Sequence, residues 1–158
     1  MPQNRVTIIR PAAVSDVPRL LALVAQYWSF EGISGFHNTR VSKQIGRLLS
    51  TPSLGAGWIA EADGLPVGYL LAVYVFSLEH LGLTAEIDEF FVLPVRRGQG
   101  VGAQLLRAAE AEFARRGCTN VALQLSRANQ AAREFYLRHA YRDRSGYELL
   151  DKNLPGPD

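Results

Sequence analysis

The stretch Arg96-Arg97-Gly98-Gln99-Gly100-Val101-Gly102 lies between a strand-like segment, Ala85 to Val92, and a helix-like segment, Val101 to Arg116. Alternate glycines let the backbone approach a ligand closely and adopt angles that other residues avoid. The start of the following helix adds N–H groups without intrahelical partners and a partial positive charge. The stretch therefore predicts a cradle for a phosphate or pyrophosphate group.

The rest of the chain predicts an α/β (α+β) fold, because strand-like and helix-like segments follow one another in the order β-α-α-β-β-β-α-β-α-β. Asp63-Gly64 predicts a hairpin turn between two of the strands. The sheet is expected to be mixed and mostly antiparallel, with helices on both faces. The expected strands are 6–10, 58–62, 67–76, 85–92, 121–125 and 147–150, and the expected helices start near 16, 38, 101 and 130.

Composition narrows the function classes. The chain has 158 residues, 47% of them hydrophobic, and a net charge of +2, which indicates one globular domain and argues against a nucleic-acid partner. Its single cysteine, Cys118, allows no internal disulfide and no cysteine metal cluster, so no metal is expected. Because the N-terminal sequence lacks a long apolar run, no membrane partner and a cytoplasmic location are expected.

A second motif reinforces the glycine-rich turn. Arg97-x-x-Gly100-x-Gly102 resembles the acyl-CoA pyrophosphate signature of the GNAT superfamily of N-acetyltransferases, and Asn129-x-x-Ala132-x-x-Phe135-Tyr136 resembles its second cofactor motif. The resemblance extends over about residues 6–150 and is nearest in character to the spermidine/spermine-type members. It implies a single GNAT domain over 1–158, with a core of about 5–152. The terminal residues Pro155-Gly156-Pro157-Asp158 themselves predict a frayed tail at 155–158. It also implies a sheet that is splayed at the cofactor site.

The same resemblance implies acetyl-CoA as the cofactor and CoA as the product. Backbone groups of the strand before the turn are expected to bind the thioester end, and an N–H near Phe90 would polarise the acetyl carbonyl. The cofactor-binding residues that it implies are Phe90, Phe91, Val92, Arg97, Gly98, Gln99, Gly100, Val101, Gly102, Asn129, Ala132 and Tyr136.

Tyr136 is the candidate general acid, which would protonate the departing CoA thiolate. A free phenol has a pKa of about 10, so it holds its proton at neutral pH. The alternative is a core tyrosine on an amphipathic helix. Asn129 is expected to cap that helix and also to contact the cofactor.

The base is sought on the strand before the glycine turn. Regular alternation places Glu86, Asp88 and Phe90 on one face, with Ile87 and Glu89 on the other. In histone-type members of the superfamily a base glutamate lies where Glu86 stands, and in spermidine/spermine-type members it lies where Asp88 stands. A bulge could change which residue faces the site. These acids could instead only attract a cationic substrate or be solvated.

The acceptor pocket is expected around the loop between the first two helices, Ser29 to His37. The candidate substrate-binding residues are Trp28, Phe30, Glu31, His37, Glu86 and Asp88. The alternative is a surface loop whose aromatic residues pack on the core. Cys118 follows a helix C-terminus, where a thiolate is disfavoured, so direct transfer in a ternary complex is preferred over an acetyl-cysteine intermediate.

Three function classes therefore compete. The first is an acetyl-CoA-dependent N-acetyltransferase acting on a small cationic amine, with a protein N-terminus or lysine as the other acceptor. The second is a dinucleotide-binding protein, suggested by Gly98-x-Gly100-x-x-Ala103 but opposed by Ser126-Arg127 where an acidic residue is required. The third is a non-catalytic CoA-binding module. A homodimer is a possible assembly.

Overall fold

The computed structural model describes residues 6–156. Its contacts divide the chain into two compact units, Met1–Gln124 and Leu125–Asp158, and each unit is described by itself below. Residues 157 and 158, part of the tail expected to fray, lie outside the described residues. The prediction of one domain over the whole chain stays a prediction.

The first unit is built on one five-stranded sheet with the strands in sequence order. Neighbouring strands are antiparallel from β1 to β4, whereas β4 and β5 are parallel. The mixed, mostly antiparallel sheet predicted from the sequence is thereby confirmed. The strands are β1 Thr7–Pro11, β2 Gly55–Ala62, β3 Leu65–Ser77, β4 Gly82–Val92 and β5 Val121–Leu123.

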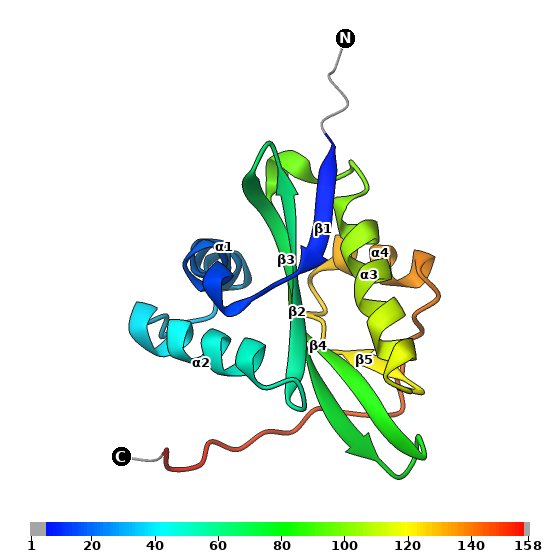
Figure 1. Cartoon of the computed structure of the whole chain (residues 1–158). Helices are drawn as coiled ribbons and strands as arrows, with labels where there is room; N and C mark the ends of the chain where they lie inside the picture. The colour runs from blue at the N-terminus through cyan, green and yellow to red at the C-terminus, as the bar shows by residue number, and fades with distance from the viewer. Residues whose placement is uncertain (1–5, 157–158) are drawn as a thin grey trace. The chain divides into compact units, whose positions relative to one another are not determined.

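Helices cover both faces of this sheet, as predicted. α1 (Val17–Glu31) and α2 (Asn38–Ser50) lie on one face, and α3 (Val101–Arg115) lies on the other (Figure 1). Short 3-10 turns at Val14–Asp16 and Pro94–Arg96 precede α1 and the glycine-rich turn. Within the described residues, none of the helices is long and apolar enough to cross a membrane.

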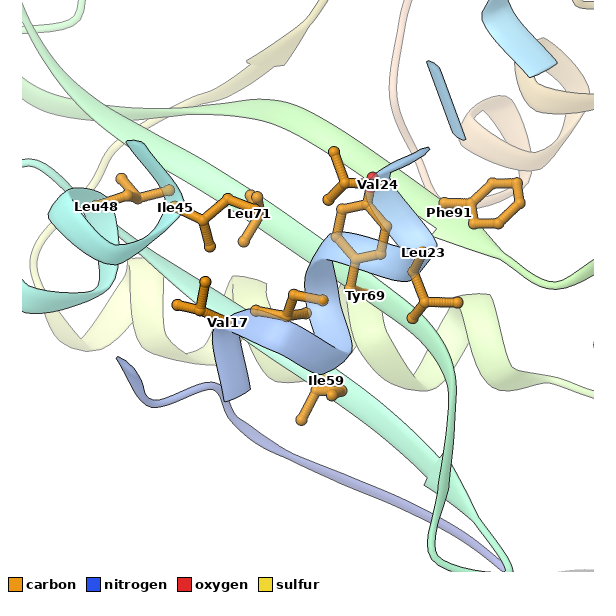
Figure 2. Packing of buried hydrophobic residues seen from close by; sticks show 10 residues of the cluster. Val17, Leu23, Val24, Ile45, Leu48, Ile59, Tyr69, Leu71 and Phe91 are labelled. Carbon is orange, nitrogen blue, oxygen red and sulfur yellow. The ribbon is translucent and has the colours of Figure 1, made fainter. Parts of the chain in front are cut away.

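A buried cluster holds α1 and α2 against the sheet (Figure 2). Leu20, Leu23 and Val24 of α1 are almost fully buried because apolar residues recur on one helical face. Tyr69 of β3 and Phe91 of β4 extend the cluster along the sheet toward the end of β4. This packing fixes the last turn of α1 over the strand that precedes the glycine turn.

The sheet opens where β4 approaches the glycine turn. β5 pairs with β4 only from Ala85 to Ile87, and β5 ends at Leu123 while β4 continues to Val92. The last five residues of β4 thus extend beyond its parallel partner, as expected for a sheet that is splayed at this point. The Asp63-Gly64 hairpin prediction is confirmed too, since both residues have the positive φ that such a tight turn requires (54° and 74°).

The second unit contains α4 (Gln130–Arg138). The strand predicted at 147–150 is wrong, because the described residues after α4 form no strand. Tyr147 and Leu149 alternate in a strand-like way, but Tyr147, Leu149 and Leu150 are each at least two-thirds exposed. Alternation alone does not make a strand when no neighbouring strand takes its backbone hydrogen bonds.

Candidate active site

The glycine-rich turn has the backbone conformation that its composition predicts. Gly98 and Gly100 have φ of 71° and 81°, and Gly100 is the N-cap residue of α3. The side chain of Val101 is buried and anchors the first turn of the helix. The first intrahelical bond runs from Gln104 N–H to the Gly100 carbonyl, so the turn leads directly into α3.

This turn suits the anionic end of a cofactor. A Cβ built on Gly98 would meet nothing within 4 Å, and one on Gly100 would meet only the Gln104 side chain at 3.8 Å, so the space beside the turn is open. No side chain caps α3, and its first turn holds no acidic residue. The N–H groups of that turn therefore remain available to an anion, as the helix dipole favours.

Arg97 connects the turn to β4 and to the end of α1. Its Nε donates to the Val92 carbonyl over 2.9 Å. Its guanidinium carbon lies 4.9 Å from the ring centre of Phe30 and 5.5 Å from that of Phe91. The side chain is exposed, so its positive charge lies between the glycine turn and the aromatic residues next to it.

A β-bulge in β4 changes the facing of its acidic residues. Leu71 of β3 pairs with Glu89, whereas the next residue of β3, Ala72, pairs with Ile87, so Asp88 is the extra residue. The prediction that Glu89 shares a face with Ile87 is therefore wrong. Because opposite residues of an antiparallel pair point the same way, Glu89 shares the α1 face with Leu71.

The bulge also changes the relation between Glu86 and Phe90, which were predicted to share one face of the sheet. Glu86 lies opposite Val73, which packs on the same core cluster as Leu71, so Glu86 and Glu89 face the same side of the sheet. Glu86 accepts a hydrogen bond from Gln124 Nε2 at 3.4 Å. Phe90 lies opposite Leu70 and points to the other face, which α3 covers. Glu86 and Phe90 thus do not share a face, contrary to the prediction.

The carboxylate of Glu89 is held by two long-range hydrogen bonds. Trp28 Nε1 donates to Oε1 over 2.6 Å, and Tyr69 Oη donates to Oε2 over 2.8 Å. Desolvation raises the pKa of Glu89 above its ordinary value, with a smaller contribution from Asp88, while the two hydrogen bonds act to lower it. The net direction is upward, so burial outweighs the two donors.

The titratable groups near Glu89 also have pKa values that burial raises. Burial, aided by the charge of Glu89, raises the pKa of Tyr69, and burial raises that of Tyr27 to about 12, so both phenols keep their protons at neutral pH. Asp88 is exposed at the surface, yet desolvation by surrounding protein atoms raises the pKa of its carboxyl. The end of α1 and the bulge of β4 thus form a region with two carboxylates, of which Asp88 is exposed and Glu89 is partly buried.

The predicted acceptor residues divide into two groups. Trp28 contacts Glu89, and Phe30 lies 6.4 Å from Phe91 between ring centres, so both adjoin the strand expected to bind the thioester. Glu31 is half-buried at the end of α1, and His37 is exposed at the N-cap of α2. Trp28, Phe30 and Glu31 belong to the last turn of α1 rather than to a loop, because the helix continues to Glu31 before Gly32 (φ 68°) ends it.

The second unit carries the other predicted motif. Asn129 caps α4, its Oδ1 accepting from Ala132 N–H over 3.1 Å, as the sequence predicts. Tyr136 is buried, with its ring centre 5.3 Å from those of both Phe135 and Tyr141. The roles assigned to Asn129 and Tyr136 toward a cofactor stay predictions.

Sequence reasoning missed Glu89 and Tyr69 as site residues. Regular alternation placed Glu89 on the wrong face, and Tyr69 is one aromatic residue within a long apolar strand. The one available signal was the run of acidic residues itself, since bulges are common next to active sites. The position of the bulge depends on β3 and is not readable from β4 alone.

Comparisons with known proteins agree with this architecture. The model of the acetyltransferase (GNAT) family matches residues 20–141, which include both cofactor motifs. The chain is 27% identical to the uncharacterized N-acetyltransferase YhfO of Bacillus subtilis (strain 168), over 93% of this chain and 97% of that protein. It is also 27% identical to aminoglycoside N(6')-acetyltransferase type 1 of Klebsiella aerogenes, with the same two coverages.

A solved structure extends the likeness to the fold. The aminoglycoside N-acetyltransferase AAC(6')-Iy, crystallised in complex with CoA, superposes with a TM-score of 0.76 at 20% identity. The match covers 100% of this chain and 98% of that chain. At this identity the likeness concerns the fold.

Proposed function

The chain belongs to the acetyltransferase (GNAT) family, and we propose that it transfers the acetyl group of acetyl-CoA directly to the primary amine of a small cationic molecule. That the chain is an acetyl-CoA-dependent N-acetyltransferase follows from the family and its relatives. The observation that carries the choice of acceptor is the acidic region beside the end of α1, which holds the exposed Asp88 and the partly buried Glu89, with the Glu89 carboxylate held by Trp28 and Tyr69. Such a region favours a cationic ligand over a neutral or anionic one.

The residues of the glycine turn would hold the cofactor. The backbone N–H groups of residues 98–102, the dipole of α3 and the charge of Arg97 are suited to its pyrophosphate. Backbone groups of Phe90, Phe91 and Val92 would bind the pantetheine arm along the open end of β4. When bound, acetyl-CoA supplies the acetyl thioester, and this chain supplies the binding, orientation and proton handling.

The reaction requires two proton transfers. An alkylammonium has a pKa of about 10.4, so the acceptor must lose a proton before it can attack. We assign that proton to one of the β4 carboxylates, Glu86 or Asp88, directly or through water. We assign the opposite role to Tyr136, whose phenol would donate its proton to the departing sulfur. The presence of a single cysteine, Cys118, with a pKa raised by burial, supports direct transfer over a thiol intermediate.

The comparison with relatives supports a small acceptor. One relative that spans almost the whole chain is named for aminoglycosides, which are small and cationic. A cytoplasmic location is part of the proposal, supported by the single cysteine and the use of acetyl-CoA. A homodimer is also part of it, and gel filtration with light scattering tests it by giving a mass of one or two chains.

The test is a thiol-release assay with acetyl-CoA over a panel of diamines, polyamines, aminoglycosides, amino acids and lysine peptides. We expect turnover with a small cationic amine, and turnover only with peptides would refute the proposed acceptor class.

Tyr136→Phe should lower kcat by about 100-fold or more while the Kd for acetyl-CoA stays the same. Tyr147→Phe is the matched control, because Tyr147 is 67% exposed. Unchanged kcat in Tyr136→Phe would remove that tyrosine from the mechanism.

A further inference from the structure

A groove of about 490 Å³ lies at the edge of the sheet, where β1 ends and β2 continues without it. Its floor is formed by residues 55–57 of β2, and its walls come from the end of α2, the turn that follows α2 and the second half of α3 (Figure 1). All of these elements belong to the first unit. The groove shares no residue with the glycine turn or with the carboxylates of β4, and small-molecule sites have volumes of roughly 300–1,000 Å³.

Gly55 presents unpaired backbone groups at the floor of the groove. Tyr74 N–H donates to the Leu54 carbonyl over 2.9 Å, so the alternation of strand hydrogen bonds turns the N–H and C=O of Gly55 away from β3. On the edge that they face, the last bond to the preceding chain runs from Ala12 N–H to the Gly57 carbonyl. Gly55 is buried, and among residues 6–156 no group is bonded to its N–H or C=O. Because buried backbone groups are rarely left unpaired, the floor favours a ligand that supplies one donor and one acceptor.

The mouth of the groove carries one excess positive charge. Arg115 donates to the Glu112 carboxylate through Nε and Nη2 over 2.7 Å each, and Arg116 donates to it through Nε over 3.0 Å. Arg116 Nη1 also donates to the Pro52 carbonyl over 2.8 Å, in the turn that leads to Gly55. Within the part of the chain that the structure describes, Nη1 of Arg115 and Nη2 of Arg116 have no hydrogen-bond partner. Two guanidinium groups and one carboxylate therefore match a ligand with a single carboxylate.

The other walls of the groove are apolar. They include Leu49 of α2, Pro52, the buried indole of Trp58, and Ala108 and Ala111 of α3. An aliphatic side chain placed between these groups would be removed from water, which favours its binding. The floor, the mouth and the walls thus favour one ligand chemistry, an amide next to a carboxylate and an apolar side chain.

We propose that this groove binds an N-acylated amino acid with an apolar side chain, at a site separate from the one that carries out acetyl transfer. A residue in extended conformation exchanges two hydrogen bonds with one residue of a neighbouring strand. The ligand N–H would donate to the Gly55 carbonyl, and one carboxylate oxygen would accept from Gly55 N–H. The other oxygen would accept from Arg115 or Arg116. Since Ala12 already occupies the pairing position at Gly57, the edge has room for one residue and not for a longer peptide strand.

Amide chemical shifts of the ¹⁵N-labelled protein test the proposal without turnover. Gly55 is used as the reporter and not as a substitution site, because a Cβ there would overlap the carbonyl oxygen of Ala72. N-acetyl-L-leucine should shift the Gly55 resonance saturably, with a Kd of about 1 mM or lower. N-acetyl-L-leucinamide lacks the charge and 4-methylpentanoate lacks the N–H, so each should bind at least fivefold more weakly. Absence of a saturable shift at Gly55, or equal affinity for either analogue, would overturn the proposal.

Substitutions on α3 locate the ligand. Ala111→Leu narrows the groove from its wall, whereas Ala114→Leu adds the same group at an exposed position of α3 outside the groove. Arg115→Gln removes a charge from the mouth, whereas Arg107→Gln removes the same charge from an exposed position on the same helix. The Kd for N-acetyl-L-leucine should rise at least tenfold in Ala111→Leu and at least threefold in Arg115→Gln, and stay within twofold in the two controls. Equal affinities within either pair would overturn the proposal.

The other occupant that a sheet edge can take is a strand from a second copy of the chain. A Gly55 resonance that moves with protein concentration in the absence of any probe would show that occupant and overturn the proposal. The titration involves no acetyl transfer, so its outcome is independent of the acceptor amine. Absence of thiol release with every small amine would refute the proposed acceptor class and leave the result at Gly55 unaffected.

Discussion

Asp16 anchors the start of α1, and its removal should weaken the fold in a pH-dependent way. Its carboxylate oxygens accept two hydrogen bonds from the Arg10 guanidinium and one from Ala13 N–H, each 2.8 Å long. Glu61 of β2 pairs with the same arginine and with Arg19 of α1. The network thus ties α1, which carries Trp28, to the edge of the sheet.

The magnitude follows from the pKa of Asp16. The Arg10 hydrogen bonds lower it from 3.8 to about 2, against the opposing effect of burial. At about 1.4 kcal/mol per pKa unit, this shift corresponds to about 2 kcal/mol of unfolding free energy. Because the folded pKa is the lower one, the contribution is complete above the unfolded pKa and is lost as pH falls toward the folded pKa.

Urea unfolding of the wild type and Asp16→Asn at pH 7 and pH 3 measures this. We expect Asp16→Asn to lower the free energy of unfolding by about 2 kcal/mol at pH 7 and by roughly half as much at pH 3. Asp143→Asn is the control, since the Arg133–Asp143 pair is 40% and 57% exposed and should contribute less than about 1 kcal/mol. An equal loss at both pH values, or none at pH 7, would refute the reasoning.

Three further predictions concern the glycine turn, the end of α4 and the cysteine. Gly98 and Gly117 both have positive φ and open space around them (71° and 82°), so alanine at either should destabilise the fold by about 1 kcal/mol. Only Gly98→Ala should weaken acetyl-CoA binding, by about tenfold in calorimetry, and equal affinities would contradict the pyrophosphate cradle. Ala140, at φ 66°, should gain about 1 kcal/mol of unfolding free energy as Ala140→Gly, and a loss would exclude the strain. Cys118→Ala should keep full thiol-release activity, and an inactive variant would argue for an acetyl-cysteine intermediate.

Much of the fold was readable from local signals. The hydrophobic period of α1 predicted a helix packed on the sheet, and Asp63-Gly64 predicted a tight turn, because each depends on residues adjacent in the chain. The cap at Asn129 is equally local, since its partner is Ala132. The backbone conformation of Gly98 and Gly100 is also predictable from local sequence, because few other residues adopt their backbone angles.

The strand predicted at 147–150 shows where local signals stop. Tyr147 and Leu149 are two residues apart, as residues on one face of a strand are, yet both are 67% exposed. A strand needs a second strand to accept and donate its hydrogen bonds, and nothing in the four residues specifies that partner. The prediction was therefore wrong for a reason that lies outside the segment.

The sequence by itself determined the family, the strand–turn–helix around Gly98 and the presence of acidic residues on β4, since these are properties of short stretches. Only the tertiary structure decided which of these acids face the side of the sheet that α1 covers. The bulge at Asp88 is a mismatch in residue count between β3 and β4, so it exists only once the two strands pair. The donors to Glu89 lie 61 and 20 residues away in sequence, and packing of α1 on the sheet brings them to one carboxylate.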